Sequence, residues 1–193
     1  VGHGLNTAPE WVIYKRRAAA DNWKVYHHTQ TATKLSNLNT TSAFSTNNDI
    51  GTAPTSSVIS VSSSDSTYLN DSSNNTYLAL AFAPVAGYSQ FGKYTSNNLA
   101  DGPFVYTGFK PRWIMFKNAT SAWGWYIHDT ERSPDNSATE HLIANATNAE
   151  ETTAIVDILS NGFKLTAISE QWNKNTDEII YIAFAENPFQ ANG

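Results

Sequence analysis

Apolar and polar side chains alternate along several short segments of the chain, which is the pattern of β-strands. In the segment 77–82, Leu78, Leu80 and Phe82 share one face, while a tyrosine and two alanines share the other. The segment 179–185 repeats this arrangement. We expect the face with the larger side chains to lie in the core, and the face with the smaller ones to approach another layer.

The segment from Trp11 to Tyr14 is apolar on both faces. A strand of this kind is covered on both sides, so we expect a long loop or another subunit beyond its own sheet.

Other segments carry weaker strand signals. Asn161-Gly162 tolerates the positive φ angles of a type I′ turn and predicts a hairpin. The stretch Ala138–Glu151 has helix-forming composition with weak periodicity, so we expect at most a short helical turn there. Residues 34–75 are rich in Ser, Thr and Asn, and predict either short edge strands or a functional surface loop. The remaining predicted strands are Trp23–His27, Val58–Val61, Phe104–Thr107, Trp125–Asp129, Thr153–Leu159 and Phe163–Ile168.

The chain repeats itself at an offset of 102 residues, the distance that separates Trp11 from Trp113. One offset at several separated blocks indicates an internal duplication. The other matches at this offset are Pro9 with Pro111, Lys15 with Lys117, Trp23 with Trp125, and 81–83 with 183–185.

These patterns predict an all-β fold, a concanavalin-like or jelly-roll-like β-sandwich with an internal pseudo-two-fold duplication. We expect one sandwich over residues 1–193, built from two repeats at about 1–91 and 103–193. Two tandem immunoglobulin-like domains, joined near Asn97–Pro103, are the alternative. Because the sequence starts at Val1 rather than at Met, we expect a fragment of a longer protein.

Composition narrows the class of partner. Charged residues make up 15% of the chain and the net charge is −5, which argues against nucleic acid or an anionic membrane as the partner. Cysteine is absent, so a disulfide scaffold is excluded. No apolar run approaches the roughly 20 residues of a membrane-spanning helix.

Several strings are familiar: "VGHGLNTAPEWVIYKRR", "GYSQFGKYTSNNLADGPFVYTGFKPRWIMFK", "WYIHDTERSPDN", "LSNGFKL" and "YIAFAENPF". Together they resemble a domain family of phage structural proteins, found in tail-fibre-like proteins of marine and cyanobacterial phages. The resemblance implies a virion component with a sandwich of the concanavalin-like lectin type, and it supplies no catalytic residues. Its implied partners are a host-surface polysaccharide or another virion protein. Fibres of the resembled class are commonly trimeric, so we expect a homo-oligomer, with a trimer favoured.

Two tryptophans have no counterpart in the other repeat, and both lie in turn-like contexts. A flat indole on a polar loop can stack on a sugar or fill a partner's pocket. We therefore select Trp172 and Trp123 as candidate ligand contacts, together with Asn173 and Tyr68. The hypothesis for Trp172 requires that its indole lie outside the domain's own core.

Other singled-out residues favour structural roles. A side chain needed at equivalent places in both repeats is most simply core, which applies to Trp11, Trp113, Trp23 and Trp125. Asp129 and Arg132, three residues apart, can close a turn by an ion pair.

Catalytic and metal signatures are sparse. No nucleophile elbow, phosphate loop or paired carboxylates stand out, so we expect no enzyme and no catalytic residue. We expect no resident cofactor, although Asn70–Asn75 and residues 133–137 offer oxygen ligands for calcium. The leading hypothesis is a virion module that binds a host-surface glycan or a neighbouring virion protein. A polysaccharide-degrading or de-esterifying phage enzyme, and a purely architectural connector, are the alternatives.

Overall fold

The computed structural model describes residues 1–47, 49–62, 69–70 and 75–187, together with the backbone but not the side chain of residue 154. Every regular element among these residues is a β-strand, so the predicted all-β class is confirmed. The described residues include no helix with the length and hydropathy of a membrane span.

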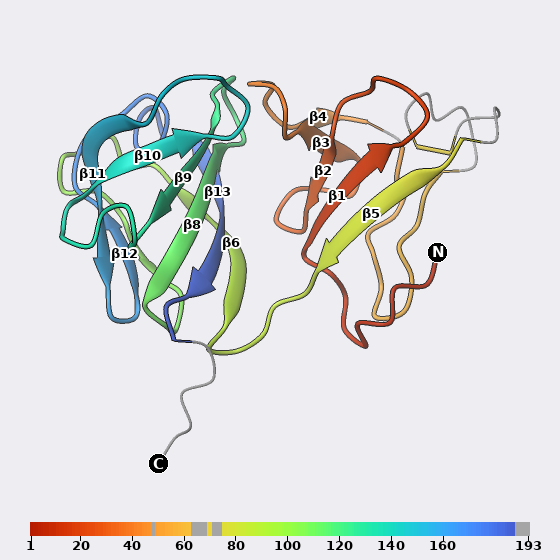
Figure 1. Cartoon of the computed structure of the whole chain (residues 1–193), viewed down its shortest axis with the longest axis horizontal. Coiled ribbons are helices and arrows are strands. Elements are labelled where there is room, and N and C mark those ends of the chain that lie inside the picture. The colour runs from red at the N-terminus through yellow and green to blue at the C-terminus, as the bar shows by residue number, and fades with distance from the viewer. Residues whose placement is uncertain (48, 63–68, 71–74, 188–193) are drawn as a thin grey trace, which may run out of the picture. The chain divides into compact units, whose positions relative to one another are not determined.

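The chain divides into two compact units, Val1–Pro84 and Val85–Gly193, called unit 1 and unit 2 below. The boundary falls between Pro84 and Val85, earlier than the Asn97–Pro103 joint of the tandem-domain alternative. Each unit has its own hydrogen-bonded sheet, and each is described by itself (Figure 1).

Unit 1 contains a five-stranded antiparallel sheet in the order β4-β3-β2-β1-β5. Its strands are β1 (Trp11–Arg16), β2 (Lys24–His27), β3 (Lys34–Asn37), β4 (Ser45–Thr46) and β5 (Tyr77–Phe82). The short strands β3 and β4 lie within the polar stretch 34–75, which agrees with the prediction of short edge strands there. The predicted strand Val58–Val61 is reduced to a single bridge between Val58 and Gly2.

One face of the unit 1 sheet is covered by the long polar stretch. Val12 and Tyr14 of β1 lie in a core cluster with three apolar residues of that stretch, Ile50, Ile59 and Leu69. Isolated apolar residues in a Ser-, Thr- and Asn-rich segment thus supply one layer of this core. All four residues from Trp11 to Tyr14 are buried, so the expectation of a strand covered on both faces is confirmed.

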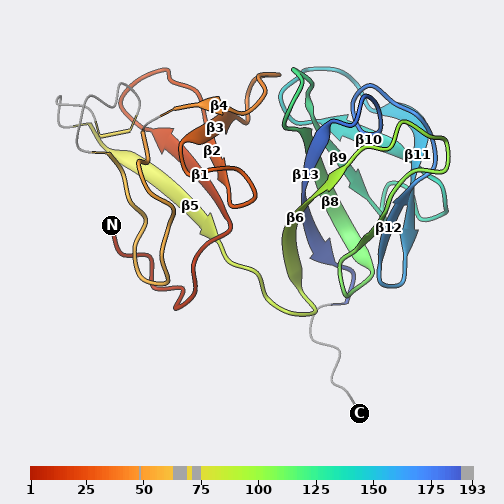
Figure 2. The same ribbon diagram turned by 180° about the vertical axis from the view of Figure 1, so that it is seen from behind.

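Unit 2 contains eight strands in the order β6-β13-β8-β9-β10-β11-β12-β7. The strands are β6 (Ser89–Thr95), β7 (Phe104–Tyr106), β8 (Pro111–Asn118), β9 (Trp125–Asp129), β10 (Ala138–Ile143), β11 (Glu151–Leu159), β12 (Gly162–Leu165) and β13 (Glu178–Ala185). Figure 2 shows these strands from behind, with β6, β13 and β8 side by side as the register requires.

The sheet of unit 2 folds over itself into two layers. β10 pairs with β9 through its last residues and with β11 through its earlier ones, so it belongs to both layers. Between the layers, Phe163 of β12 meets Phe116 of β8 and Tyr181 of β13 edge-on, each with ring centroids 5.3 Å apart. This packing is that of a β-sandwich, as the sequence predicted.

The two units share a register at the offset found in the sequence. β1 pairs with β5 so that Trp11 lies opposite Phe82, and β8 pairs with β13 so that Trp113 lies opposite Phe184. β2 and β9 keep the same correspondence on the other side of β1 and β8. The strands β2-β1-β5 and β9-β8-β13 are therefore equivalent ladders. A duplication of the whole chain, and one sandwich spanning both repeats, stay predictions.

The hairpin predicted at Asn161-Gly162 is present, because Leu159 pairs with Gly162 across a two-residue turn. Its glycine serves another purpose than the one expected. A Cβ on Gly162 would lie 2.0 Å from the carbonyl oxygen of Val105, so glycine is needed where β7 approaches β12. The expected helical turn within Ala138–Glu151 is wrong, since this segment forms β10 and pairs on both sides.

Candidate functional site

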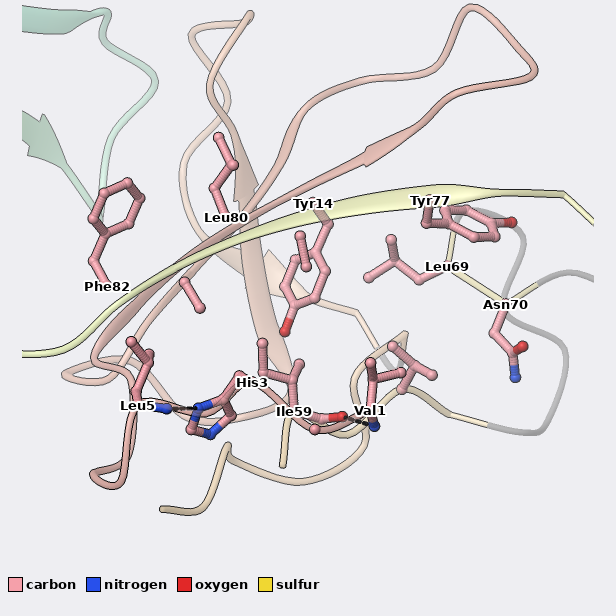
Figure 3. A pocket seen from close by; sticks show the side chains of 14 residues that line it. Val1, His3, Leu5, Tyr14, Ile59, Leu69, Asn70, Tyr77, Leu80 and Phe82 are labelled. Atoms are coloured by element: carbon pink, nitrogen blue, oxygen red, sulfur yellow. Dashed lines mark hydrogen bonds between the residues drawn. The ribbon is translucent and has the colours of Figure 1, made fainter. Parts of the chain in front are cut away.

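A pocket of about 690 Å³ lies in unit 1, on the face of the sheet that carries the core cluster (Figure 3). β1 and β5 form one wall, and the first residues of the chain form the opposite wall together with the segment around Ile59. The volume is within the range of small-ligand pockets. Its lining residues are Val1, Gly2, His3, Leu5, Tyr14, Ile59, Val61, Leu69, Asn70, Tyr77, Ala79, Leu80, Ala81 and Phe82.

Tyr14 supplies a hydroxyl group to this mostly apolar lining. Its side chain is 2% exposed, and Figure 3 shows the ring directed from β1 toward Ile59. The Oη atom has no hydrogen-bond partner among the described residues. Burial, and then the nearby Tyr26, raise the pKa of Tyr14 above its usual range, so the hydroxyl stays protonated and can donate.

The N-terminal residues are held in place by the segment 55–59. The nitrogen of Val1 donates to the Ile59 carbonyl at 2.9 Å, and the Ile59 amide donates to the Val1 carbonyl at 2.8 Å. His3 accepts from the Leu5 amide through Nδ1 at 3.1 Å, which leaves Nε2 protonated to donate to the Thr55 carbonyl at 3.0 Å. Both ring nitrogens of His3 are thereby engaged in shaping the wall.

β5 is the edge strand beside the pocket. Leu78 is 41% exposed and Leu80 is 39% exposed, although the sequence predicted this larger face to be core. That prediction is wrong for β5 and right for β13, where Ile180 and Ile182 are fully buried. The sequence does not distinguish the two strands, because the difference lies in their neighbours: β13 is central and β5 is at an edge.

The pocket can enclose an apolar group, and the Tyr14 hydroxyl can donate one hydrogen bond to an acceptor atom beside that group. Its titratable side chains are those of Tyr14, His3 and Tyr77. Among the residues that the structure describes, no three His, Cys, Asp or Glu side chains gather in a group that could hold a metal ion. A mostly apolar lining with one hydroxyl group suits a ligand that is itself largely apolar.

The prediction for Trp172 as a ligand contact is wrong. Its indole is 2% exposed and lies in the core of unit 2. It meets Tyr126 edge-on with ring centroids 4.6 Å apart and His141 at 5.3 Å. The polar neighbours of Trp172 in the sequence suggested a loop tip, but the loop folds back so that the tryptophan closes the sandwich.

Asn173 is also structural rather than ligand-binding. The side chain is fully buried, and its Nδ2 donates to the carbonyls of Leu99 at 2.8 Å and Ala167 at 3.0 Å. Its Oδ1 accepts from the Asn97 amide at 3.0 Å. The buried amide thus ties the loop 97–101 to the loop before β13, which is why it is unavailable to a ligand.

The two remaining predicted contacts stay predictions. Trp123 is half-buried and packs against the core of unit 2, with part of its side chain exposed. Tyr68 lies outside the described residues.

The four tryptophans expected in the core differ in how far they are buried. Trp11 is 5% exposed and Trp125 is fully buried, as predicted. Trp113 is half-buried and packs on Phe184, with ring centroids 5.7 Å apart. The prediction for Trp23 is wrong: it is 36% exposed because it precedes β2, whereas the equivalent Trp125 lies within β9.

The turn predicted at Asp129 and Arg132 is confirmed. Arg132 donates from Nε to Asp129 Oδ2 at 3.0 Å, while Asp129 Oδ1 accepts the amides of Glu131 and Arg132. Arg132 also pairs with Glu150. Of the two calcium candidates, residues 71–74 of Asn70–Asn75 lie outside the described residues, and Ser133 of the other hydrogen-bonds to Glu140.

Unit 2 also buries a pair of stacked histidines that the sequence did not single out. His128 and His141 are each 1% exposed, with ring centroids 5.2 Å apart. Burial, and then the nearby His141, lower the pKa of His128 to about 3. Neither ring nitrogen of His128 has a hydrogen-bond partner among the described residues. The pair lies inside the core, so it serves packing rather than ligand binding.

The family model described as "Domain of unknown function (DUF7483)" matches residues 1–188. The chain belongs to this family. No curated protein and no solved structure matches the chain. The family match spans both units, so the pocket of unit 1 and the sandwich of unit 2 are parts of one family domain.

Sequence reasoning missed the pocket for two reasons. Its hydroxyl belongs to Tyr14, which sits in an apolar strand and was assigned to packing. Its other wall comes from the chain start and from Ile59, which are far from β5 in the sequence. The sequence alone carries no signal that marks the pocket, because the edge position of β5 follows from its pairing partners.

Proposed function

We propose that this chain is a non-enzymatic structural module of a phage virion, and that the pocket of unit 1 binds a neighbouring virion protein. The observation that carries the proposal is the apolar pocket of about 690 Å³ beside the exposed strand β5. Exposed apolar side chains around a pocket favour a protein partner. The virion setting rests on the sequence resemblance.

A protein partner is favoured over a glycan by the chemistry of the lining. A sugar presents many hydroxyls that require hydrogen-bonding groups around them. The pocket offers the hydroxyl of Tyr14 among largely apolar side chains, and the side chain of Asn70 already donates to the Ser62 carbonyl. The tryptophan that motivated the glycan hypothesis, Trp172, is buried in the core of unit 2.

The test uses particles that carry the whole protein with a photoreactive benzoylphenylalanine at position 80. Leu80 lines the pocket and is 39% exposed. Irradiation of purified particles is expected to link position 80 to another virion polypeptide, identified by mass spectrometry. The matched control places the same residue at position 168, since Ile168 is 51% exposed in unit 2.

Equal linkage from positions 80 and 168 would contradict the proposal. A second assay measures binding of the isolated chain to host-surface polysaccharide, and release of reducing ends from it. If the chain binds polysaccharide saturably and substitutions in the pocket weaken that binding, the partner is a glycan rather than a protein. Release of reducing ends would replace the binding module by an enzyme.

A further inference from the structure

We infer that the outer face of unit 2 carries a second binding site, at which Phe104 and Tyr106 stack on a neutral glycan. This site goes beyond the proposed function, because it lies in unit 2 and takes a different class of ligand from the pocket of unit 1. Its basis is the placement of two exposed aromatic rings on β7, together with the charges beside them.

The alternation along β7 places both rings on one face. Phe104 is 47% exposed and Tyr106 is 62% exposed, whereas Val105 between them is buried in the core of unit 2. β7 pairs with β12, so that Tyr106 lies opposite Gly162 and Phe104 lies opposite Lys164. Because residues opposite each other share a face of the sheet, the two rings stand beside a glycine and a lysine rather than beside other apolar side chains.

Both rings rest against positions that have no side chain. A Cβ on Gly162 would lie 3.2 Å from Cε2 of Phe104, so the phenylalanine ring leans across β12. A Cβ on Gly108 would lie 3.5 Å from Oη of Tyr106 and 3.7 Å from two of its ring carbons, so the tyrosine ring lies along the turn after β7. Each ring thus has backbone on one side and solvent on the other, which is the arrangement that leaves an aromatic face open for stacking.

The equivalent segment of unit 1 forms without these rings. At the offset of 102 residues, Phe104 and Tyr106 correspond to Gly2 and Gly4. Gly2 makes a bridge to Val58, so this segment joins its neighbour with no aromatic side chain at either position. The rings are therefore not needed for strand pairing, and their exposure shows that they add little to the core of unit 2.

The exposed area of the two rings is too small for a stable protein interface. An aromatic side chain can bury about 150–250 Å². Two rings that are about half exposed therefore leave roughly 200 Å² together, whereas a stable protein interface buries about 800 Å² on each partner. Two neighbouring rings match one or two sugar units, because the C–H groups on one face of a sugar pack against an aromatic ring.

Groups that can bond to sugar hydroxyls lie beside the rings. Lys164 donates from Nζ to the Gly102 carbonyl at 3.0 Å and pairs with Oδ1 of Asp101 at 2.6 Å. The side chain of Asp101 is 88% exposed. The hydrogen bond from Lys164, and then its charge, lower the pKa of Asp101, so the carboxylate stays ionised and can accept from hydroxyls.

The charges at this place favour a neutral glycan over an anionic one. Lys164 pairs with Asp101 and lies opposite Asp157 of β11, so one positive charge stands among two carboxylates. A phosphate, sulfate or uronate group would meet a net negative charge here. The same balance argues against stacking of nucleic acid bases, because their phosphates would be repelled as well.

The test applies the 193-residue chain, assembled into tetramers on streptavidin to gain avidity, to an array of neutral and anionic oligosaccharides. We expect binding to neutral members of the array. The neutral oligosaccharide that binds best is then titrated with the untagged chain and followed by proton NMR. Stacking on the rings should shift the C–H protons of the sugar upfield.

Four variants separate stacking from general apolar contact. Tyr106→Ala and Phe104→Ala should each weaken binding by about tenfold, because each removes one stacking face. Tyr106→Phe keeps the ring and should bind within about threefold of the unchanged chain, whereas Tyr106→Leu keeps an apolar side chain without a ring and should bind as weakly as Tyr106→Ala. The matched control Leu99→Ala changes another exposed side chain of unit 2 and should have no effect. Thermal melting checks that every variant folds.

Several results would overturn the inference. These are no binding to any neutral oligosaccharide, a preference for the anionic ones, or unchanged binding by Tyr106→Leu. Self-association that Tyr106→Ala abolishes would assign the rings to a second copy of the chain. Tetranitromethane should also nitrate Tyr106 in assembled particles as it does in the isolated chain, and shielding of Tyr106 in particles would show that another polypeptide covers the rings.

Failure of this inference is distinguishable from failure of the proposed function. Linkage from position 80 to another virion polypeptide, without glycan binding, refutes the glycan site alone. Glycan binding that Leu80→Lys removes and Tyr106→Ala leaves intact would place the glycan in the pocket of unit 1, and would refute both.

Discussion

Acid should destabilise the fold through His128, a buried histidine that the folded chain keeps neutral. Its pKa is lowered to about 3, first by burial and then by His141, while Asp129 opposes the change. The reference pKa for the unfolded chain is 6.5. Between these two values the unfolded chain binds a proton that the folded chain rejects, so stability is lost as the pH falls below 6.5.

The size of this effect follows from the two pKa values. Each pH unit within the window changes the free energy of unfolding by at most about 1.4 kcal/mol. Between pH 7.5 and 4.5 the loss attributable to this one side chain is about 2–3 kcal/mol. That is a large part of the ~5–15 kcal/mol that holds an ordinary domain folded.

The assay is urea unfolding at several pH values between 4.5 and 7.5, for the unchanged chain and for His128→Leu, which keeps a similar volume in the core. The variant should lose less stability over this range, by about 2–3 kcal/mol. Leu99→Gln, a change at an exposed side chain of unit 2 that does not titrate, should leave the pH dependence as it is. A pH dependence that His128→Leu leaves unaltered would refute the reasoning.

Three further predictions test other parts of the structure. Trp172→Ala should cost about 3–5 kcal/mol in chemical unfolding, because it empties a core site, whereas an exposed contact residue would cost less than ~1 kcal/mol. Tyr14→Phe should leave the isolated chain equally stable or stabilise it by about 1 kcal/mol, because it removes a buried hydroxyl without a partner among the described residues. A clear loss of stability on unfolding in urea would show that the hydroxyl does have a hydrogen-bond partner. Burial lowers the pKa of Lys117 to about 7, so stability should rise as the pH rises from 7 to 10, and Lys117→Met should flatten this rise in the same unfolding assay.

The sequence predicted the strand class and the equivalent ladders well, because both depend on local patterns. Alternating side chains identified β9, β11 and β13, and the offset that joins Trp11 to Trp113 is the offset of the strand registers. It did not predict β10, whose helix-forming composition is overridden by pairing on both sides. Local propensity is a weak guide when tertiary pairing competes with it.

The candidate site could not be predicted from the sequence, because the exposure of a side chain depends on its neighbours in space rather than on its residue type. Trp172 has polar neighbours in the sequence and is buried, whereas Leu80 has apolar neighbours and is exposed. Knowing that β5 is an edge strand and β13 a central one requires the pairing partners of each. Asp129 and Arg132 were predictable because their turn is closed within four residues.

Hydrogen–deuterium exchange of residues 77–82 in the isolated chain and in assembled particles tests most directly whether the β5 edge is a binding surface. The account predicts that this segment exchanges faster in the isolated chain than in the assembled particle. Equal exchange of residues 77–82 in both states would contradict it, because this surface would then stay uncovered in the particle.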